Sequence, residues 1–165
     1  MKRLTLVRHG KSSWRDPGRD DFDRPLNKRG KHDAPLMGKR LAARESRPEL
    51  LLSSPARRAR QTAKLICWAL ELPEGRLVLV DGIYEAGSET LLDVVRSLDD
   101  CWQHALLVGH NPGITELGNL LADCGIEHFP TCGVLCLDFA VEVWTDVAPG
   151  AGHLVFFDYP KKHFL

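Results

Sequence analysis

Three stretches of the sequence place arginine, histidine or serine directly after a short apolar run. They are Arg8-His9-Gly10, Ser53-Ser54-Pro55 with Arg58, and Gly109-His110-Asn111. In an open α/β sheet the carboxyl ends of parallel strands meet at one edge, and ligands bind at that edge. Two arginines, two histidines and a helix N-terminus can therefore converge. Such a group would bind an oxyanion, because guanidinium groups match phosphate geometry and helix amides add positive potential.

The two histidines suit different tasks in phosphoryl transfer. A nucleophilic histidine must be neutral, and the nearby cations Arg8 and Arg58 disfavour protonation of His9. His110 can instead donate a hydrogen bond to a phosphoryl oxygen, where a bound anion favours its protonated form. Phosphoryl transfer asks mainly for in-line positioning and stabilisation of charge. We therefore expect His9 to attack phosphorus while Arg8, Arg58 and His110 bind the phosphate.

A leaving group also needs a proton. Glu85 follows the third apolar run in a loop, and it is the best candidate for this general acid. The alternative is that Glu85 is a solvated loop carboxylate with no role. Lys11, Ser12 and Asn111 lie close to the two histidines in sequence and are expected at the rim of the substrate site.

The remaining pattern predicts the elements that position these residues. Short apolar runs alternate with amphipathic stretches, which is typical of a mostly parallel α/β sheet. The last two apolar runs follow one another without a helix, so we expect an antiparallel pair near one edge. The expected strands are 4–7, 50–52, 77–80, 105–109, 134–139 and 153–157, and the expected helices are 28–44, 55–70, 88–98 and one from about 112 to 122.

Several local features carry specific expectations. Asn27 should cap the first helix, and Pro35 should kink that helix or start a second segment. A serine cap followed by proline at the first helical position predicts a helix start at Pro55. Ser88 should cap the third helix, and Arg15 to Arg24 reads as a surface loop. We expect Gly10 to let the backbone turn sharply after the first strand.

Composition bounds the class of protein. A chain of 165 residues with 44% hydrophobic and 27% charged residues fits one globular domain spanning 1–165. No apolar run approaches a membrane span, and the chain enters its first strand without room for a signal peptide, so a cytoplasmic location is expected. Net charge is zero, but residues 1–64 hold 18 basic and 7 acidic residues, a net +11. This asymmetry favours an anion-binding pocket, whereas the spread of the cations without a known motif argues against nucleic acid.

The five cysteines do not suggest a disulfide framework, because their number is odd and no CxxC pair is present. Cys124, His128, Cys132 and Cys136 recur every four residues, which could indicate zinc. Gly125 and the proline at 130 interrupt any single helix there, and the spacing matches no common zinc signature. We expect no bound metal and no cofactor.

These motifs together resemble those of the histidine phosphatase superfamily, the phosphoglycerate-mutase-like group, and most closely its SixA-type phosphohistidine phosphatases. Arg8 to Ser12 matches the first motif, Ser53 to Thr62 the second, and Val108 to Gly113 the third, while Tyr84 to Ala86 resembles the acid-bearing loop. In the second motif the phosphate ligand is Arg58. The resemblance implies a three-layer α/β/α sandwich, a phosphohistidine intermediate on His9 and no metal. Some SixA-type members lack a matching acid, so Glu85 is carried over with less support.

Several functions remain open from the sequence. The leading hypothesis is a metal-independent phosphatase acting on protein phosphohistidine. A phosphatase of small phosphorylated molecules or a phosphomutase would use the same fold. A phosphate-binding scaffold without catalysis, or a metal-binding His/Cys protein, would belong to other classes. The sequence does not indicate the physiological substrate or the oligomeric state.

Overall fold

The computed structural model describes residues 1–162 of the chain, which form six strands and four α-helices. None of the helices in this part is long and apolar enough to cross a bilayer. The strands are β1 (Lys2–Arg8), β2 (Leu50–Ser53), β3 (Leu77–Leu79), β4 (His104–Gly109), β5 (Val134–Phe139) and β6 (His153–Asp158), and the helices are α1 (Lys28–Ala42), α2 (Arg57–Ala69), α3 (Ser88–Arg96) and α4 (Gly113–Ala122).

The strands form one sheet in the order β3-β2-β4-β1-β5-β6. The first four are parallel, whereas β5 runs antiparallel to both β1 and β6, as the sequence predicts. Register aligns the three candidate motifs, because Arg8 pairs with Gly109 and Ser53 with Val108. The carboxyl ends of β1, β2 and β4 therefore open at the same edge of the sheet.

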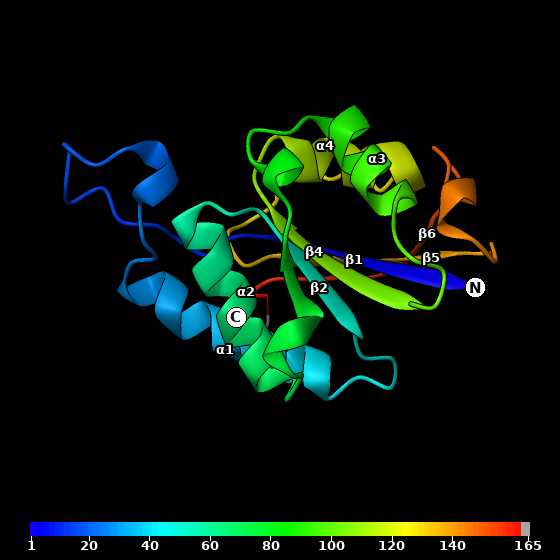
Figure 1. Cartoon of the computed structure of the whole chain (residues 1–165), viewed down its shortest axis with the longest axis horizontal. Coiled ribbons are helices and arrows are strands. Elements are labelled where there is room, and N and C mark those ends of the chain that lie inside the picture. Colours follow the sequence, from blue (N-terminus) through cyan, green and yellow to red (C-terminus); the bar gives the residue numbers. More distant parts are fainter. Residues whose placement is uncertain (163–165) are drawn as a thin grey trace.

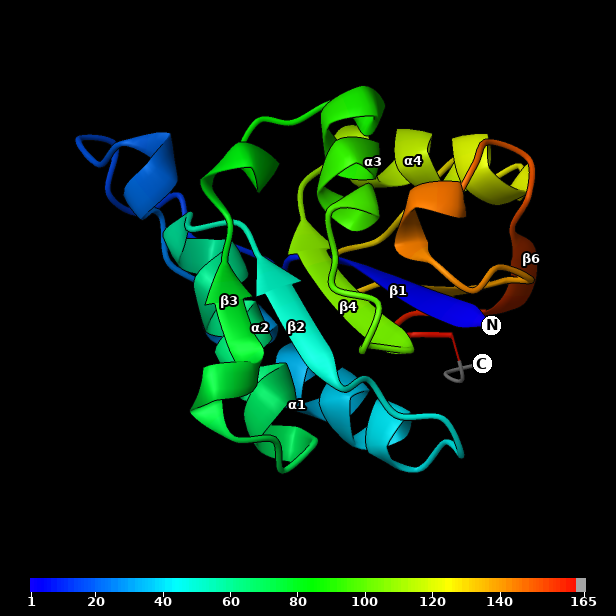
Figure 2. The same cartoon turned by 45° about the vertical axis from the view of Figure 1, so that its right-hand side comes forward.

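The sheet lies between two pairs of helices, α3 and α4 on one face and α1 and α2 on the other (Figures 1 and 2). Alternating residues of the central strands supply two separate cores. Leu4 and Leu6 of β1 pack with the α3–α4 layer, whereas Val7 packs with the α1–α2 layer. Burial on both faces makes these strands almost continuously apolar, as in other parallel sheets. The three-layer α/β/α architecture is confirmed.

Two helix starts differ from the prediction. The second helix begins at Arg57 rather than Pro55, because the Ser54 hydroxyl accepts a hydrogen bond from the Ala56 amide at 3.2 Å and shapes a turn before the helix. Ser88 is the first residue of α3, and no side chain caps that helix.

The first helix confirms one expectation and corrects another. The Asn27 side chain accepts from the Gly30 amide at 2.9 Å and caps α1 as predicted. The same helix continues through Pro35 without a second segment. Burial of its apolar face, including Met37 and Leu41, offsets the lost hydrogen bond.

Gly10 is needed for a reason other than the one predicted. Its backbone is not among the positive-φ positions of the described chain. A Cβ at this position would instead lie 3.0 Å from the Cys132 sulfur and 3.2 Å from the Gly30 Cα. Glycine therefore allows the segment after β1 to pass close to α1, and this close passage fixes the place of His9.

Candidate active site

A cavity of about 370 Å³ lies at the carboxyl edge of the sheet, where β1, α2 and the segment after β4 meet. Its size is within the range of ligand-binding pockets. The residues that line it are Arg8, His9, Lys11, Ser12, Trp14, Arg24, Arg58, His110, Asn111 and Thr131. The structure thus brings together the four residues expected to bind and transfer phosphate, as well as the three expected at the rim.

His9 presents a free nitrogen to this cavity. Its Nδ1 lies 2.7 Å from the Gly10 carbonyl oxygen. Because a carbonyl can only accept, Nδ1 carries the proton and Nε2 keeps its lone pair. The Arg58 Nε group donates to this Nε2 at 3.4 Å. The geometry thus leaves His9 in the tautomer that a nucleophile requires.

The position of Arg58 relative to His9 is set by Thr62, one turn later on α2. The Gly10 amide donates to the Thr62 hydroxyl at 2.9 Å, and this hydroxyl donates to the Arg58 carbonyl at 2.8 Å. Thr62 is fully buried. This chain of hydrogen bonds joins the end of β1 to the first turn of α2.

His110 and Arg8 each hold an unsatisfied polar atom at the site. His110 Nε2 lies 2.8 Å from the Ser54 hydroxyl, and Arg8 donates from Nη1 to the Phe129 carbonyl at 2.8 Å. Within residues 1–162, Arg8 Nε and His110 Nδ1 are the buried side-chain polar atoms without a hydrogen-bond partner. Buried polar groups are nearly always satisfied, so each such atom requires an explanation. Both atoms belong to residues predicted to bind phosphate.

Both histidines are held neutral in the free protein. Burial is the main cause that lowers the pKa of His9 to about 3. The charge that His110 carries when it is protonated and the charges of Arg58 and Arg8 act in the same direction. Burial, followed by the charge of Arg58, lowers the pKa of His110 to about 4. The nearby cations Arg8 and Arg58 favour a neutral His9 as expected from the sequence, but loss of solvation is the larger effect.

Asp21 also belongs to the site, although it is not among the residues predicted from the sequence. It lies in the segment Arg15 to Arg24, which was predicted to be a surface loop. Its carboxylate accepts from Arg58 Nη2 at 3.0 Å, from the Tyr84 hydroxyl at 2.8 Å and from Arg24 Nε at 3.2 Å. Its backbone carbonyl accepts from Arg58 Nη1 at 2.7 Å. An acidic cluster within the strongly basic part of the chain was the available sequence signal.

The electrostatics of Asp21 follow from these contacts. Partial burial opposes its ionisation, but the hydrogen bonds from Tyr84, Arg58 and Arg24 outweigh that effect and lower its pKa to about 2. Burial and the bond to Asp21 raise the pKa of Tyr84 to about 12. Asp21 is therefore an anion across the physiological range. It orients the Arg58 guanidinium while the Arg58 Nε stays directed at His9.

Glu85 lies beside this site but does not line the cavity. Its side chain is exposed, on a loop that follows a short 3₁₀ turn at Asp81–Ile83. The preceding residue, Tyr84, contacts the His110 ring with a centroid separation of 5.6 Å. The loop therefore reaches the site through Tyr84, whereas Glu85 is an exposed residue that interacts with Tyr84 and does not line the cavity.

The rim combines exposed and anchored residues. Lys11 and Asn111 are exposed, while the Ser12 hydroxyl accepts from Arg24 Nη1 at 2.6 Å. Trp14 is 75% exposed, and the Arg24 guanidinium lies 3.5 Å from the centroid of its ring. The mouth of the cavity is thus formed by side chains that an incoming substrate can reach.

The cysteines do not form a metal-binding cluster among the described residues. All five are free thiols, and Cys132 and Cys136 are buried in the interior. The described residues contain no cluster of three or more His, Cys, Asp or Glu side chains with a geometry that could hold a metal.

Comparison with family models gives a match over residues 4–85 to the histidine phosphatase superfamily, branch 1. An uncharacterized protein of Mycobacterium tuberculosis (strain H37Rv) is 34% identical over 94% of this chain and 100% of its own length. An uncharacterized chloroplastic protein of Arabidopsis thaliana is 30% identical over 88% of this chain and 70% of its own length. The sequence similarity therefore extends well beyond the first two motifs.

Solved structures agree with this assignment. The crystal structure of a candidate phosphohistidine phosphatase SixA from Agrobacterium tumefaciens is 32% identical, with a TM-score of 0.82 over 96% of this chain and 98% of that one. A protein histidine phosphatase SixA complexed with tungstate shares the fold at 22% identity, with a TM-score of 0.76 over 96% of this chain and 97% of that one. The chain therefore belongs to the histidine phosphatase superfamily and is of the SixA type.

Proposed function

We propose that the whole chain is a single catalytic domain that removes phosphate from its substrate through a covalent intermediate on His9. The observation that carries this proposal is the convergence of Arg8, Arg58 and His110 around one cavity on a neutral His9, whose Nε2 is unprotonated and accepts only a long hydrogen bond of 3.4 Å from Arg58. Of the two unsatisfied atoms, Arg8 Nε is a donor for a phosphoryl oxygen, and His110 Nδ1 becomes one when it carries a proton.

The first step forms one bond and breaks another. The lone pair on His9 Nε2 attacks phosphorus, and the bond between phosphorus and the leaving oxygen or nitrogen breaks. Its electron pair goes to the leaving atom, which takes up a proton from solvent. The imidazole gains positive charge, which the hydrogen bond from Nδ1 to the Gly10 carbonyl stabilises. Arg8, Arg58 and His110 stabilise the charge on the equatorial phosphoryl oxygens.

The second step returns the nucleophile. A water oxygen attacks phosphorus, the Nε2–P bond breaks, and its electron pair returns to His9 Nε2. The two protons of this water leave with orthophosphate, as dihydrogen phosphate, and exchange with solvent. We propose that no metal takes part, because the arginines already supply the positive charge that a metal would bring to the phosphoryl oxygens.

Phosphohistidine on a protein is the substrate that the position of Glu85 favours. A phosphoester needs a strong proton donor at the leaving oxygen, and Glu85 is exposed and outside the cavity lining. A phosphoramidate is cleaved readily once its nitrogen is protonated, so it depends less on a placed acid. The mouth formed by exposed Lys11, Trp14 and Asn111 admits a phosphoryl group on a large carrier. Five free thiols fit a reducing compartment such as the cytoplasm.

Rapid quench with labelled substrate tests the intermediate. We expect an acid-labile, base-stable phosphoryl adduct on His9, and a loss of about 10⁴-fold or more in kcat for His9→Ala. An adduct elsewhere, or a His9→Ala variant that keeps more than about a hundredth of wild-type kcat, would refute the role of His9.

The substrate class needs a separate comparison. We expect kcat/KM for a phosphohistidine-bearing protein to exceed that for small sugar phosphates, and Glu85→Gln to cost more on the sugar phosphates. A preference of about tenfold or more for a small phosphoester, equal to about 1.4 kcal/mol in the barrier, would place the protein among small-molecule phosphatases instead.

A further inference from the structure

A second cavity, here called the flanking cavity, adjoins the candidate active site. Its volume is about 430 Å³, and it is lined by Arg8, Lys11, Arg29, Asp33, His128, Pro130, Thr131, Tyr159, Pro160 and Lys161. Arg8, Lys11 and Thr131 line both cavities, so the two lie side by side and share these residues. No step of the proposed reaction uses this space.

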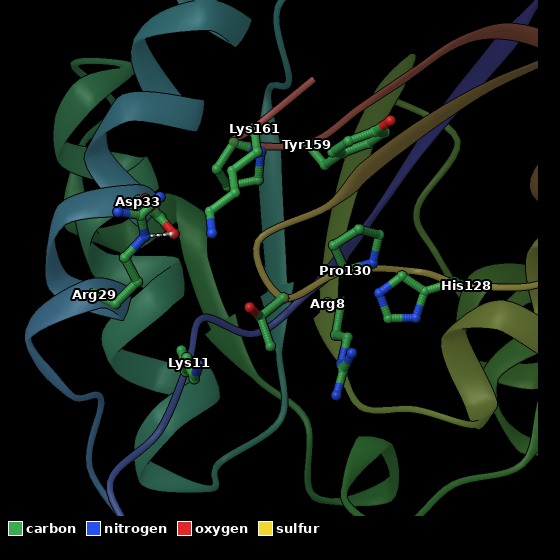
Figure 3. A pocket seen from close by; sticks show the side chains of 10 residues that line it. Arg8, Lys11, Arg29, Asp33, His128, Pro130, Tyr159 and Lys161 are labelled. Carbon is green, nitrogen blue, oxygen red and sulfur yellow. Dashed lines mark hydrogen bonds and ion pairs between the residues drawn. The ribbon is translucent and has the colours of Figure 1, made fainter. Parts of the chain in front are cut away.

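Side chains from distant parts of the chain surround the flanking cavity (Figure 3). Arg29 and Asp33 project from α1 on one side, and His128 and Pro130 lie on the opposite side. Lys161, from the segment after β6, directs its amine toward the space between them. The cavity is therefore assembled by the fold and is not a local loop feature.

The charges on these walls are unbalanced. Four lining residues are arginine or lysine, and Asp33 is the one carboxylate among them. Asp33 is 4% exposed and already engaged, because Arg29 Nε donates to it at 3.2 Å and His32 Nδ1 lies at 3.1 Å. Neither Lys11 nor Lys161 forms an ion pair with any residue of the described chain. A concave surface with uncompensated cations concentrates positive potential and attracts anions.

We propose that the flanking cavity binds a second anionic group of the substrate, a phosphate or a carboxylate, while the transferred phosphoryl group occupies the active site. This rests on the proposed function. Lys11 and Lys161 contribute point charges to this group, and Arg8 lies between the two anions. The substrates preferred by this protein would then carry a second negative charge on the leaving-group side.

Binding of simple probes tests the flanking cavity without any turnover. Calorimetry would compare α,ω-alkylenediphosphonates of one to four methylene groups with monophosphonates of the same chain length. These compounds have P–C bonds that the reaction cannot cleave. We expect at least one spacer to bind about tenfold more tightly than its matched monophosphonate.

The variants locate that advantage. Lys161→Gln should reduce it by about fivefold or more, since Lys161 lines only the flanking cavity. Lys39→Gln is the matched control, because Lys39 is an exposed lysine on α1 that lines neither cavity. If no spacer binds better than its monophosphonate, or if the advantage is the same in both variants, the proposal is wrong.

Kinetic arms then distinguish the source of the second anion. Phosphohistidine peptides with Glu or Gln near the phosphohistidine test a carboxylate, and sugar bisphosphates against monophosphates test a second phosphate. For whichever of these two substrate types carries the second anion, Lys161→Gln should raise KM and leave kcat unchanged. This is the result expected when a residue binds the substrate and the transition state equally well. An effect on neither arm would contradict the proposal. A Lys161-dependent diphosphonate advantage in a protein with no phosphatase activity would refute the proposed function and leave the anion site standing.

Discussion

Acidification from pH 7.5 to pH 5.0 should destabilise this fold by about 6 kcal/mol through three histidines. The pKa of His9 is lowered to about 3, and those of His104 and His110 to about 4, in each case mainly by burial. In the unfolded chain a histidine titrates near 6.5. Below that pH the unfolded state binds protons that the folded state does not, so the free energy of unfolding falls as the pH falls. At pH 5.0 each histidine contributes about 2 kcal/mol of this loss.

Carboxylates do not obscure this window. The pKa of Asp21 is lowered to about 2 in the folded protein, whereas an unfolded aspartate has a pKa near 3.9. Asp21 therefore stabilises the fold at pH values above 3.9 and loses this contribution only as the pH falls from 3.9 toward 2. The pKa of Asp138 is lowered by its hydrogen bond from Arg3, and its effect has the same sign and the same upper limit. Between pH 7.5 and 5.0 the histidines therefore dominate.

Urea unfolding at the two pH values measures the effect, and His104 provides the control. His104 lies at the start of β4, away from the cavity, with Nε2 2.7 Å from the Thr5 hydroxyl. His104→Gln should reduce the pH-dependent loss by about 2 kcal/mol. Imidazole NMR should show His9 and His110 neutral at pH 5.0. A total loss below about 2 kcal/mol, or titration of either site histidine near 6.5, would refute the reasoning.

Three further results are expected. In steady-state kinetics on any accepted phosphate, Arg58→Ala should lower kcat/KM by about 10²–10³, while Arg60→Ala should change kcat/KM little. A comparable loss for Arg60→Ala would mean that Arg60 also binds phosphate. Asp21→Asn should lower kcat by about tenfold without raising KM. Arg58 loses the carboxylate that orients its guanidinium, and the bound phosphate loses a nearby negative charge that repels it. A raised KM at unchanged kcat would instead place Asp21 in contact with substrate. Activity should persist in excess chelator and be inhibited by vanadate, and a loss restored by a divalent ion would overturn the metal-free mechanism.

The parts of the site that lie at strand ends could be predicted from the sequence. Arg8 is the last residue of β1, and His9 and His110 directly follow β1 and β4. Both strands are buried on both faces, and such strands are recognised by their continuous apolar residues. Parallel pairing then brings the carboxyl ends of these strands to one edge of the sheet, so the paths of the loops need not be known to place these residues together. Arg58 could be placed because helical periodicity separates the buried face of α2 from the exposed one.

The parts supplied by loops could not be predicted in the same way. Asp21 reaches Arg58 across 37 positions in sequence, and nothing in a polar segment with a proline and a glycine indicates where it folds back. The flanking cavity likewise depends on Lys161, which lies in the irregular segment after β6 and lines the same space as Arg29 and Asp33 of α1. Local patterns encode strands and helices, whereas these contacts depend on the paths of irregular segments.

This division has a consequence for how the site can vary. His9 follows the central strand β1, whose residues Leu6 and Val7 are fully buried. Arg58, which donates a hydrogen bond to His9, is held through its carbonyl by the buried Thr62 hydroxyl. A displacement of His9, the proposed nucleophile, would require repacking of the core, so the proposed reaction is tied to the stability of the sheet. The groups around the mouth lie on exposed segments that contribute little to the core, and loops of this kind accept substitution readily. Changes there should alter KM and substrate preference at nearly constant stability, whereas changes at the strand ends should alter kcat.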